Sequence, residues 1–263
     1  MDLGIKDKKV LITGSTKGIG FKIAEGMGKE GSIVYVNGRT KAAVDKAIKE
    51  LKQSIPEGKF LEAIGDISNE EGISELHKKI PEIDILINNA GYFEPKSFFE
   101  ITRNDWTQIY ETNVVSGARL TQIYLKGMIQ RNQGRVIFIS SESALNIPVE
   151  MVHYGMTKTA QLSIARGSAE LCKGTNVTVN SILPGPTLSE GVEEFIHSLA
   201  VSSGKSDADM ANDFIKENRP SSINQRFAKP EEIANVVVFL SSEKASMING
   251  SAVRVDGGVI KSI

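Results

Sequence analysis

Short apolar runs alternate with longer amphipathic segments along almost the whole chain, and this alternation restricts the possible folds more than any other feature of the sequence. The runs occupy residues 10–12, 32–36, 59–64, 83–87, 135–139, 177–182 and 251–255. Short runs rich in β-branched residues are typical of buried strands, and the segments between them have helical periodicity. Strands that alternate with helices predict a doubly wound, mostly parallel α/β sheet of seven strands with helices on both faces.

The alternation contains no repeat and no linker, so we expect residues 1–263 to form one domain. A chain of this length is long for one domain, but α/β folds of this size often have a single core. The regular pattern is broken over residues 188–226, where helical stretches are mixed with polar, low-complexity sequence. Because this segment follows the end of a strand, it is either a substrate lid or a flexible surface excursion.

Charge and composition exclude several classes of function. The 31 basic and 32 acidic residues give a net charge of −1, which provides no basic surface for nucleic acid and favours a small-molecule ligand. The single cysteine, Cys172, excludes an intrachain disulfide, and His77, His153 and His197 lack the spacing of metal ligands. Residues 1–9 contain no apolar leader and no run is long enough for a membrane span, so we expect a cytoplasmic protein without a membrane partner.

Gly14, Gly18 and Gly20 form a Gly-x-x-x-Gly-x-Gly turn between the first predicted strand and the first predicted helix. Glycine allows a tight turn and a close approach of backbone to ligand, and the start of a helix directs N–H groups at a phosphate. The spacing differs from the common Gly-x-Gly-x-x-Gly fingerprint, and a purely structural turn would look the same. Its place at the start of the alternation favours phosphate binding.

Two cations predict the form of a dinucleotide cofactor. About 20 residues after the glycine turn, an acidic side chain would suit the ribose of NAD(H), whereas a basic one suits the 2′-phosphate of NADP(H). Arg39 follows the second strand and Lys17 lies in the turn, so we expect NADP(H) to be preferred, with NAD(H) possible. Either cation alone could also be a solvated surface charge.

Other candidate ligand-binding residues follow other strands, because the carboxyl ends of parallel strands share one edge of the sheet. Asp66 could accept a hydrogen bond from adenine or cap the next helix. The amides of Asn88-Asn-Ala-Gly91 could contact the cofactor or tie neighbouring strands together. Pro184-Gly-Pro186 forms a rigid turn that could line a ligand site.

Tyr154 and Lys158 lie four residues apart in a helix predicted over residues 153–171, so their side chains share one face. An ammonium beside a phenol favours the phenolate, and we expect it to lower the pKa of Tyr154 toward the range where acid–base catalysis is efficient. Ser140 and Ser141 follow the strand at residues 135–139 and bring hydroxyl groups to the same edge. A Tyr-x-x-x-Lys motif taken by itself is usually two ordinary surface residues. The other motifs of this chain favour a catalytic role.

Asn113 interrupts a long amphipathic helix predicted over residues 103–128. An amide within a helix competes with the backbone for hydrogen bonds. Its side chain could face solvent or hold a water molecule inside the protein.

Taken in order, these motifs resemble the short-chain dehydrogenase/reductase family over residues 8–258. The resemblance implies a Rossmann-type domain and an NAD(P)-dependent oxidoreductase. It implies that Tyr154 is the general acid for carbonyl reduction and the base in the reverse direction, and that Ser141 orients the carbonyl oxygen. Lys158 would bind the nicotinamide ribose and lower the pKa of the tyrosine, and Asn113 would hold a water that links Lys158 to solvent.

The same resemblance implies a cofactor site and a quaternary structure. The cofactor residues would be Gly14, Thr16, Lys17, Gly18, Ile19, Gly20, Arg39, Asp66, Ile67, Asn89, Ala90, Gly91, Tyr154, Lys158, Pro184, Thr187 and Ser189. Members of the family are commonly dimers or tetramers built from two long helices and the last strand, so we expect a homo-oligomer, with a homotetramer as the expected form.

Glu142 departs from the family pattern, which usually has a small or apolar residue after the catalytic-type serine. We expect its side chain to face solvent; turned into the site, it would favour a polar or cationic substrate.

Within the family, the basic pair favours an NADPH-dependent carbonyl reductase similar to the 3-oxoacyl thioester (acyl-carrier-protein) reductases. The alternative is an NAD(P)-dependent dehydrogenase of a sugar, polyol or other secondary alcohol. A non-catalytic NADPH-sensing module is disfavoured because all four catalytic positions are present.

Overall fold

The computed structural model describes residues 1–263 and contains the expected seven-stranded sheet. The strands are β1 (Lys9–Ile12), β2 (Ile33–Gly38), β3 (Lys59–Ile64), β4 (Ile85–Asn88), β5 (Gly134–Ile139), β6 (Val177–Pro184) and β7 (Ala252–Val255). They lie in the order β3-β2-β1-β4-β5-β6-β7, and every neighbouring pair is parallel. The predicted doubly wound sheet is confirmed, and it is parallel throughout.

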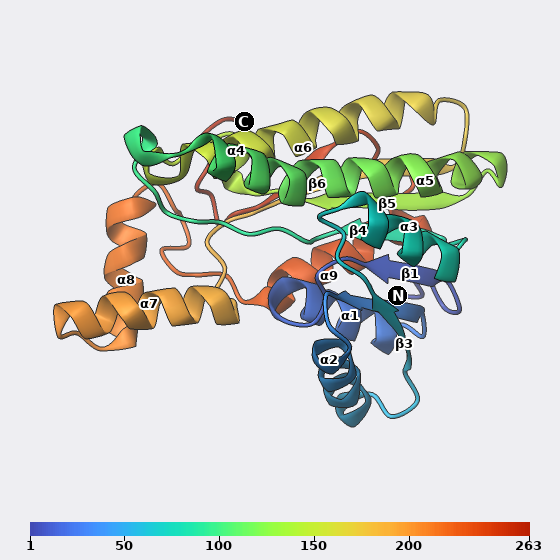
Figure 1. Ribbon diagram of the computed structural model, residues 1–263, viewed down its shortest axis with the longest axis horizontal. Helices are drawn as coiled ribbons and strands as arrows, with labels where there is room; N and C mark the ends of the chain where they lie inside the picture. The colour runs from blue at the N-terminus through green and yellow to red at the C-terminus, as the bar shows by residue number, and fades with distance from the viewer.

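Helices cover both faces of the sheet. They are α1 (Gly18–Lys29), α2 (Lys41–Ser54), α3 (Glu70–Lys79), α4 (Arg103–Tyr110), α5 (Ser116–Gln130), α6 (Val152–Leu171), α7 (Glu190–Ser203), α8 (Asp207–Asn218) and α9 (Pro230–Leu240). In Figure 1, α1, α2 and α9 lie on one face and α4, α5 and α6 on the other, while α7 and α8 project to one side. A membrane crossing needs a helix that is both long and apolar, and none of these helices meets both conditions.

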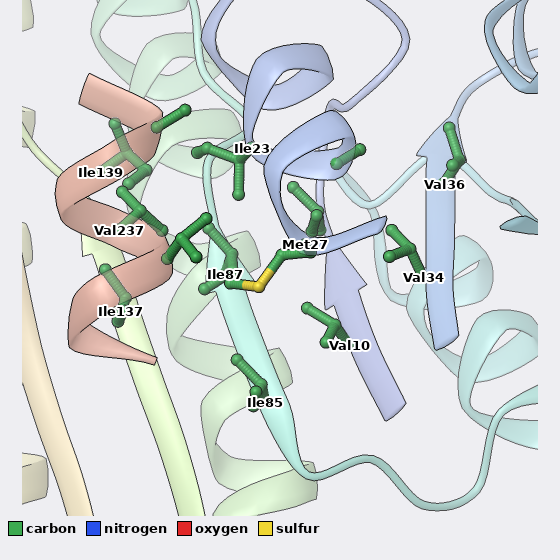
Figure 2. Close-up of a cluster of buried hydrophobic side chains, with 14 of the residues drawn as sticks. Val10, Ile23, Met27, Val34, Val36, Ile85, Ile87, Ile137, Ile139 and Val237 are labelled. Carbon is green, nitrogen blue, oxygen red and sulfur yellow. The ribbon is translucent and has the colours of Figure 1, made fainter. Parts of the chain in front are cut away.

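The strands are apolar on both faces because each face is covered by helices. Val10 and Ile12 of β1 point into a cluster of 23 buried residues beneath α1 and α9. Leu11, between them, points into a second cluster of 19 residues on the opposite face. Figure 2 shows the first cluster, in which Met27 of α1 lies over the strands and Val237 of α9 packs beside β5.

The prediction of one long helix over residues 103–128 is wrong in one respect. The structure divides it into α4 and α5, joined by a π-helical turn, η2 (Glu111–Val115), that contains Asn113. The Asn113 amide leaves the helix surface to bind the backbone of Tyr92, accepting from its N–H at 3.0 Å and donating to its carbonyl at 2.9 Å. The position of the interruption was correctly predicted; its π-helical form was not.

The strand order reverses at β1 and β4, which lie side by side although β2 and β3 come between them in the chain. In sheets of this kind a ligand binds at the carboxyl ends of the strands, in the crevice where the order reverses. The predicted ligand-binding residues follow β1, β2, β3, β4, β5 and β6, and therefore gather along this one edge.

Candidate active site

The glycine turn leaves the start of α1 open toward a cavity. Gly14 and Gly18 have φ angles of +59°, which favour glycine. A Cβ atom on Gly20 would lie 2.6 Å from the Gly14 carbonyl oxygen and 2.4 Å from the Asn89 side-chain nitrogen, so a side chain does not fit there. Asn37 and Asn89 hold the turn: Asn37 Oδ1 accepts from the Gly14 N–H at 3.1 Å, and Asn89 Nδ2 donates to the Gly14 carbonyl at 3.0 Å.

The turn opens into a cavity of about 870 Å³ that extends to Tyr154 and to the helices α7 and α8. It is lined by most of the predicted site residues: Gly14, Lys17, Gly18, Ile19, Gly20, Asn89, Gly91, Ser141, Tyr154, Lys158, Pro184, Thr187 and Ser189. The remaining predicted residues, Thr16, Arg39, Asp66, Ile67, Ala90 and Asn113, lie outside its lining. The open glycine turn and a cavity of this size fit a dinucleotide.

The two predicted cations have side chains without protein partners. Neither side chain makes a hydrogen bond or an ion pair, whereas many other lysine and arginine side chains at the surface are paired. Asp66 does not cap the next helix, because Asn69 does so by accepting from the Gly72 N–H at 2.9 Å. Instead the Asp66 carboxylate accepts from the Ser68 hydroxyl at 2.7 Å, which, with help from Arg39, lowers its pKa.

The end of β5 and the helix α6 are joined at the predicted catalytic residues. Ser140 Oγ donates to the Lys158 carbonyl at 2.9 Å, and Lys158 Nζ donates to the Ile139 carbonyl at 2.9 Å. Ser141 Oγ accepts from the Ser143 N–H at 3.1 Å, which orients the hydroxyl in the wall of the cavity. The Lys158 ammonium lies 5.5 Å from the centre of the Tyr154 ring. The predicted Ser141, Tyr154 and Lys158 are thus brought together.

Burial controls the pKa of both titratable groups. It raises the pKa of Tyr154 to about 12, and the interaction with the Ser141 hydroxyl offsets only part of this rise. Burial lowers the pKa of Lys158 to about 7. The expected net lowering of the Tyr154 pKa is not found in this structure, because loss of water outweighs the influences that favour the phenolate. Tyr154 is therefore a protonated phenol at neutral pH, which is the form that donates a proton.

Asn113 is buried and positions groups on both sides of it. Besides binding Tyr92, its side chain donates to the Thr157 hydroxyl at 3.2 Å. Its backbone carbonyl accepts from Gln161 Nε2 at 2.5 Å. Asn113 therefore connects the loop after β4 to α6, the helix that carries Tyr154 and Lys158.

Glu142 does not face solvent, contrary to expectation. Its side chain lies in a 3₁₀ turn, η3 (Glu142–Ala144), is only 2% exposed, and accepts from Arg219 Nε at 2.6 Å. Arg219 follows α8 and is 7% exposed. Both residues line the cavity, and both charges act on the pKa of Tyr154, so they lie near its hydroxyl group.

Sequence reasoning missed Arg219, because it pairs with a residue 77 positions away and nothing in its neighbourhood marks it. It also missed Glu190, the first residue of α7, whose carboxylate accepts from the Gly18 N–H at 3.2 Å. A third missed residue is Gln161, an amide one turn after Lys158; a polar side chain on the buried face of the helix was the available signal.

The segment at residues 188–226 forms α7 and α8, which close one side of the cavity. Aromatic rings join them to each other and to the chain beyond: Phe195 meets Phe214 edge-on with centroids 6.1 Å apart, and Phe214 stacks on Phe227 at 5.7 Å. All three rings line the cavity. Thr187, at the base of the segment, forms a parallel bridge with Ala228.

Comparisons with known proteins show similarity along most or all of the chain. A family model described as short chain dehydrogenase matches residues 8–199. The uncharacterized oxidoreductase YvaG of Bacillus subtilis is 49% identical over 263 residues, covering 100% of both chains. The 3-oxoacyl-acyl-carrier-protein reductase FabG of Aquifex aeolicus is 31% identical, covering 98% of this chain and 100% of its own. A crystal structure of L-sorbose reductase from Gluconobacter frateurii, complexed with NADPH and L-sorbose, has a TM-score of 0.94 at 32% identity, covering 100% of both chains.

Proposed function

Because this chain belongs to the short-chain dehydrogenase/reductase family and is an NAD(P)-dependent oxidoreductase, we propose that it reduces the carbonyl group of a small polyhydroxylated ketone with NADPH. The observation that carries the substrate class is the buried Glu142–Arg219 pair beside the catalytic residues. This reverses the order of the two alternatives that the sequence left open, in which a 3-oxoacyl thioester came first.

The preference for NADP(H) is supported by the unpartnered side chains of Lys17 and Arg39. Two unpaired cations after the ends of β1 and β2 suit the 2′-phosphate, which NAD(H) lacks. The amino end of α1, opened by Gly14, Gly18 and Gly20, suits the pyrophosphate. The L-sorbose reductase with the same fold was crystallised with NADPH.

The protein's part in the chemistry is to orient the carbonyl and to supply a proton. The cofactor, when bound, supplies hydride to the carbonyl carbon. The Ser141 hydroxyl and the protonated Tyr154 phenol both line the cavity and can donate hydrogen bonds to the carbonyl oxygen. As that oxygen gains negative charge, Tyr154 transfers its proton and Lys158 stabilises the phenolate that remains. We propose that Asn113 holds a water molecule through its backbone and not through its side chain, because the side chain already binds Tyr92 and Thr157.

Glu142 and Arg219 suit hydroxyl groups better than an acyl chain. A buried ion pair leaves acceptor and donor capacity next to the reacting carbonyl, and an apolar substrate would cover these groups without hydrogen bonds, at a cost of roughly 1–3 kcal/mol for each. Glu142 Oε2 has only a long contact with Asn146 at 3.4 Å, and Arg219 Nη2 has no protein partner. A polyhydroxylated ketone supplies hydroxyl groups to both.

A 3-oxoacyl thioester remains the second candidate because of the aromatic wall formed by Phe195, Phe214 and Phe227. These rings offer apolar surface at the side of the cavity away from β1. The relative that is a 3-oxoacyl-acyl-carrier-protein reductase points the same way.

The test is the initial rate of NADPH oxidation with ketoses, keto-sugar acids, simple ketones and 3-oxoacyl thioesters. We expect the highest kcat/KM for a ketose or keto-sugar acid, and loss of turnover with intact NADPH binding in Tyr154→Phe. Arg219→Met should raise KM for the polyhydroxylated substrate about ten-fold more than it raises KM for simple ketones. A preference for thioesters, unaltered by Arg219→Met, would reject the proposed substrate class.

We also propose that the protein works in the cytoplasm as a homo-oligomer of one domain per chain, with residues 188–226 as its substrate lid. Apolar side chains exposed just before α6, among them Leu145 and Val149, support the oligomer. Light scattering after gel filtration tests it, and a monomer at micromolar concentration would contradict it.

A further inference from the structure

The Lys158 ammonium is buried without a carboxylate beside it. The residue is 5% exposed, and burial is the one influence that shifts its pKa. Its Nζ atom has two acceptors in the protein, the Ile139 carbonyl at 2.9 Å and Gln161 Oε1 at 3.4 Å. The placement and charge of this ammonium therefore depend on two neutral oxygens, of which only one belongs to a side chain.

Gln161 lies one turn after Lys158 on the same face of α6 and is 2% exposed. Its Nε2 donates to the Asn113 carbonyl at 2.5 Å. Because a carbonyl can only accept, the amide nitrogen must face Asn113 and the amide oxygen must face Lys158. The reversed amide would set oxygen against oxygen and N–H against ammonium, so the geometry fixes which end of Gln161 meets the lysine.

The far end of this connection is rigid. Asn113 lies in the π-helical turn η2, and its side chain is held by the backbone of Tyr92 and the hydroxyl of Thr157. Its carbonyl is thus a fixed point to which Gln161 is attached. The chain of hydrogen bonds runs from the loop after β4, through Asn113 and Gln161, to Lys158.

We infer that Gln161 is a positioning residue, whose amide ties the Lys158 ammonium directly to the Asn113 carbonyl and holds it beneath Tyr154. An amide does not take up and release a proton near neutral pH, so this link fixes the ammonium and carries no proton. The catalytic part of this inference rests on the proposed function; the effect on Lys158 does not.

The titratable and charged groups around Lys158 are few. Tyr154 lies one turn before it on α6, and Glu142 and Arg219 act on Tyr154 from η3 and from the end of α8. None of these groups is among the causes that shift the pKa of Lys158. A substitution of Gln161 should therefore change the pKa of Lys158 directly.

The experiment is an NMR titration of the full-length protein with labelled lysine side chains, in which Lys158→Met assigns the Lys158 signal. Gln161→Leu removes the acceptor and should lower the pKa of Lys158, whereas Gln161→Glu adds a carboxylate and should raise it. Gln130→Leu, the same change at an exposed helical site on α5, is the matched control and should leave the titration as in wild type.

The kinetic arm separates positioning from folding. Gln161→Leu should lower kcat roughly ten-fold, the loss expected for one hydrogen bond to a charged group, with little change in KM or in NADPH binding measured by fluorescence. The rate should fall at lower pH than in wild type, because the ammonium form is lost earlier. If Gln161→Leu does not fold, the nearly isosteric Gln161→Glu still gives the diagnostic upward shift.

A Lys158 titration that is the same in wild type, Gln161→Leu and Gln161→Glu would overturn the inference. So would shifts in the same direction in both variants, since a general loosening of the helix would produce them. The NMR arm uses no substrate. If the wild type turns over no carbonyl compound, the proposed function is rejected, but the NMR titration still tests whether Gln161 positions Lys158.

Discussion

Lys158, which we propose to be catalytic, lowers the stability of the folded protein near neutral pH because its ammonium is buried. Its ammonium is buried, and burial brings its pKa down to about 7 from an ordinary value of 10.5. The unfolded chain keeps the ordinary value, so between these two pH values it binds more protons at this site than the folded protein does. Stability therefore rises with pH over this window and stops changing below pH 7, where both states are charged.

We expect the free energy of unfolding of wild type, minus that of Lys158→Met, to increase between pH 7 and pH 10 by at most about 1.4 kcal/mol per pH unit. Urea unfolding at several pH values measures this difference, in which the other titrating groups cancel. Lys173→Met, at an exposed lysine, is the control. Parallel curves for wild type and Lys158→Met would mean that Lys158 is charged in the folded protein over the whole range.

The unpaired side chain of Arg39 is the proposed partner of the cofactor 2′-phosphate. Arg39→Glu should weaken NADPH binding roughly 100-fold, because a favourable contact with the 2′-phosphate becomes a repulsion, and should change NADH binding little. Fluorescence titration with both nucleotides measures the two affinities. Lys52→Glu makes the same charge reversal on the exposed face of α2 and should alter neither. Equal losses for both nucleotides would remove Arg39 from the 2′-phosphate site.

Among the elements, α1 and α7 meet at the position where a pyrophosphate is expected. Glu190, at the start of α7, places a carboxylate on the Gly18 N–H at the amino end of α1. A carboxylate there is favoured by the helix dipole, as a phosphate would be. We therefore expect the Glu190 side chain to leave when the cofactor enters, which would couple the start of α7 to the proposed cofactor site.

Glu190→Gln should bind NADPH about three- to ten-fold more tightly than wild type, because the competing negative charge is gone. The neighbouring Glu194→Gln, exposed on the same helix, should bind as wild type does. The gain should shrink in high salt, which screens the repulsion. Unchanged or weaker binding by Glu190→Gln would show that its carboxylate does not compete with the cofactor.

The elements were predictable from sequence to the extent that local pattern determines them. Residues 59–64 were predicted as a strand and form β3, and α6 begins one residue before its predicted start. The π-helical turn at Asn113 was not predictable in form, because Tyr92 and Thr157 stabilise it from elsewhere in the chain. The Glu142–Arg219 pair was missed for the same reason. The motifs identified Ser141, Tyr154 and Lys158 as candidate catalytic residues. The pKa values of Tyr154 and Lys158 depend on burial, which only the fold reveals.

At the scale of the whole molecule, stability comes from two apolar clusters pressed against opposite faces of one sheet. Phe138 of β5 is fully buried at the centre of the second cluster. We expect Phe138→Ala to lower the free energy of unfolding by about 3–5 kcal/mol, since the ring leaves a cavity that close-packed strands cannot fill. Urea unfolding measures this loss.

Phe99 is the matched control for Phe138, because its ring is 95% exposed. Phe99→Ala should change the free energy of unfolding by less than about 0.5 kcal/mol. A loss below about 1 kcal/mol for Phe138→Ala would mean that the sheet and α5 close over the vacated space.

The place of β1 in the sheet bears on how the chain reaches this structure. Val10 of β1 pairs on one side with Val34 and on the other with Ile85, so one neighbour is synthesised soon after β1 and the other much later. A growing chain that pairs β1, β2 and β3 before β4 is available would expose β1 as an open apolar edge. Such edges recruit other chains, and pairing between distant segments is slow. Refolding should therefore be sensitive to protein concentration, and chains released from the ribosome before β4 should be the ones that aggregate.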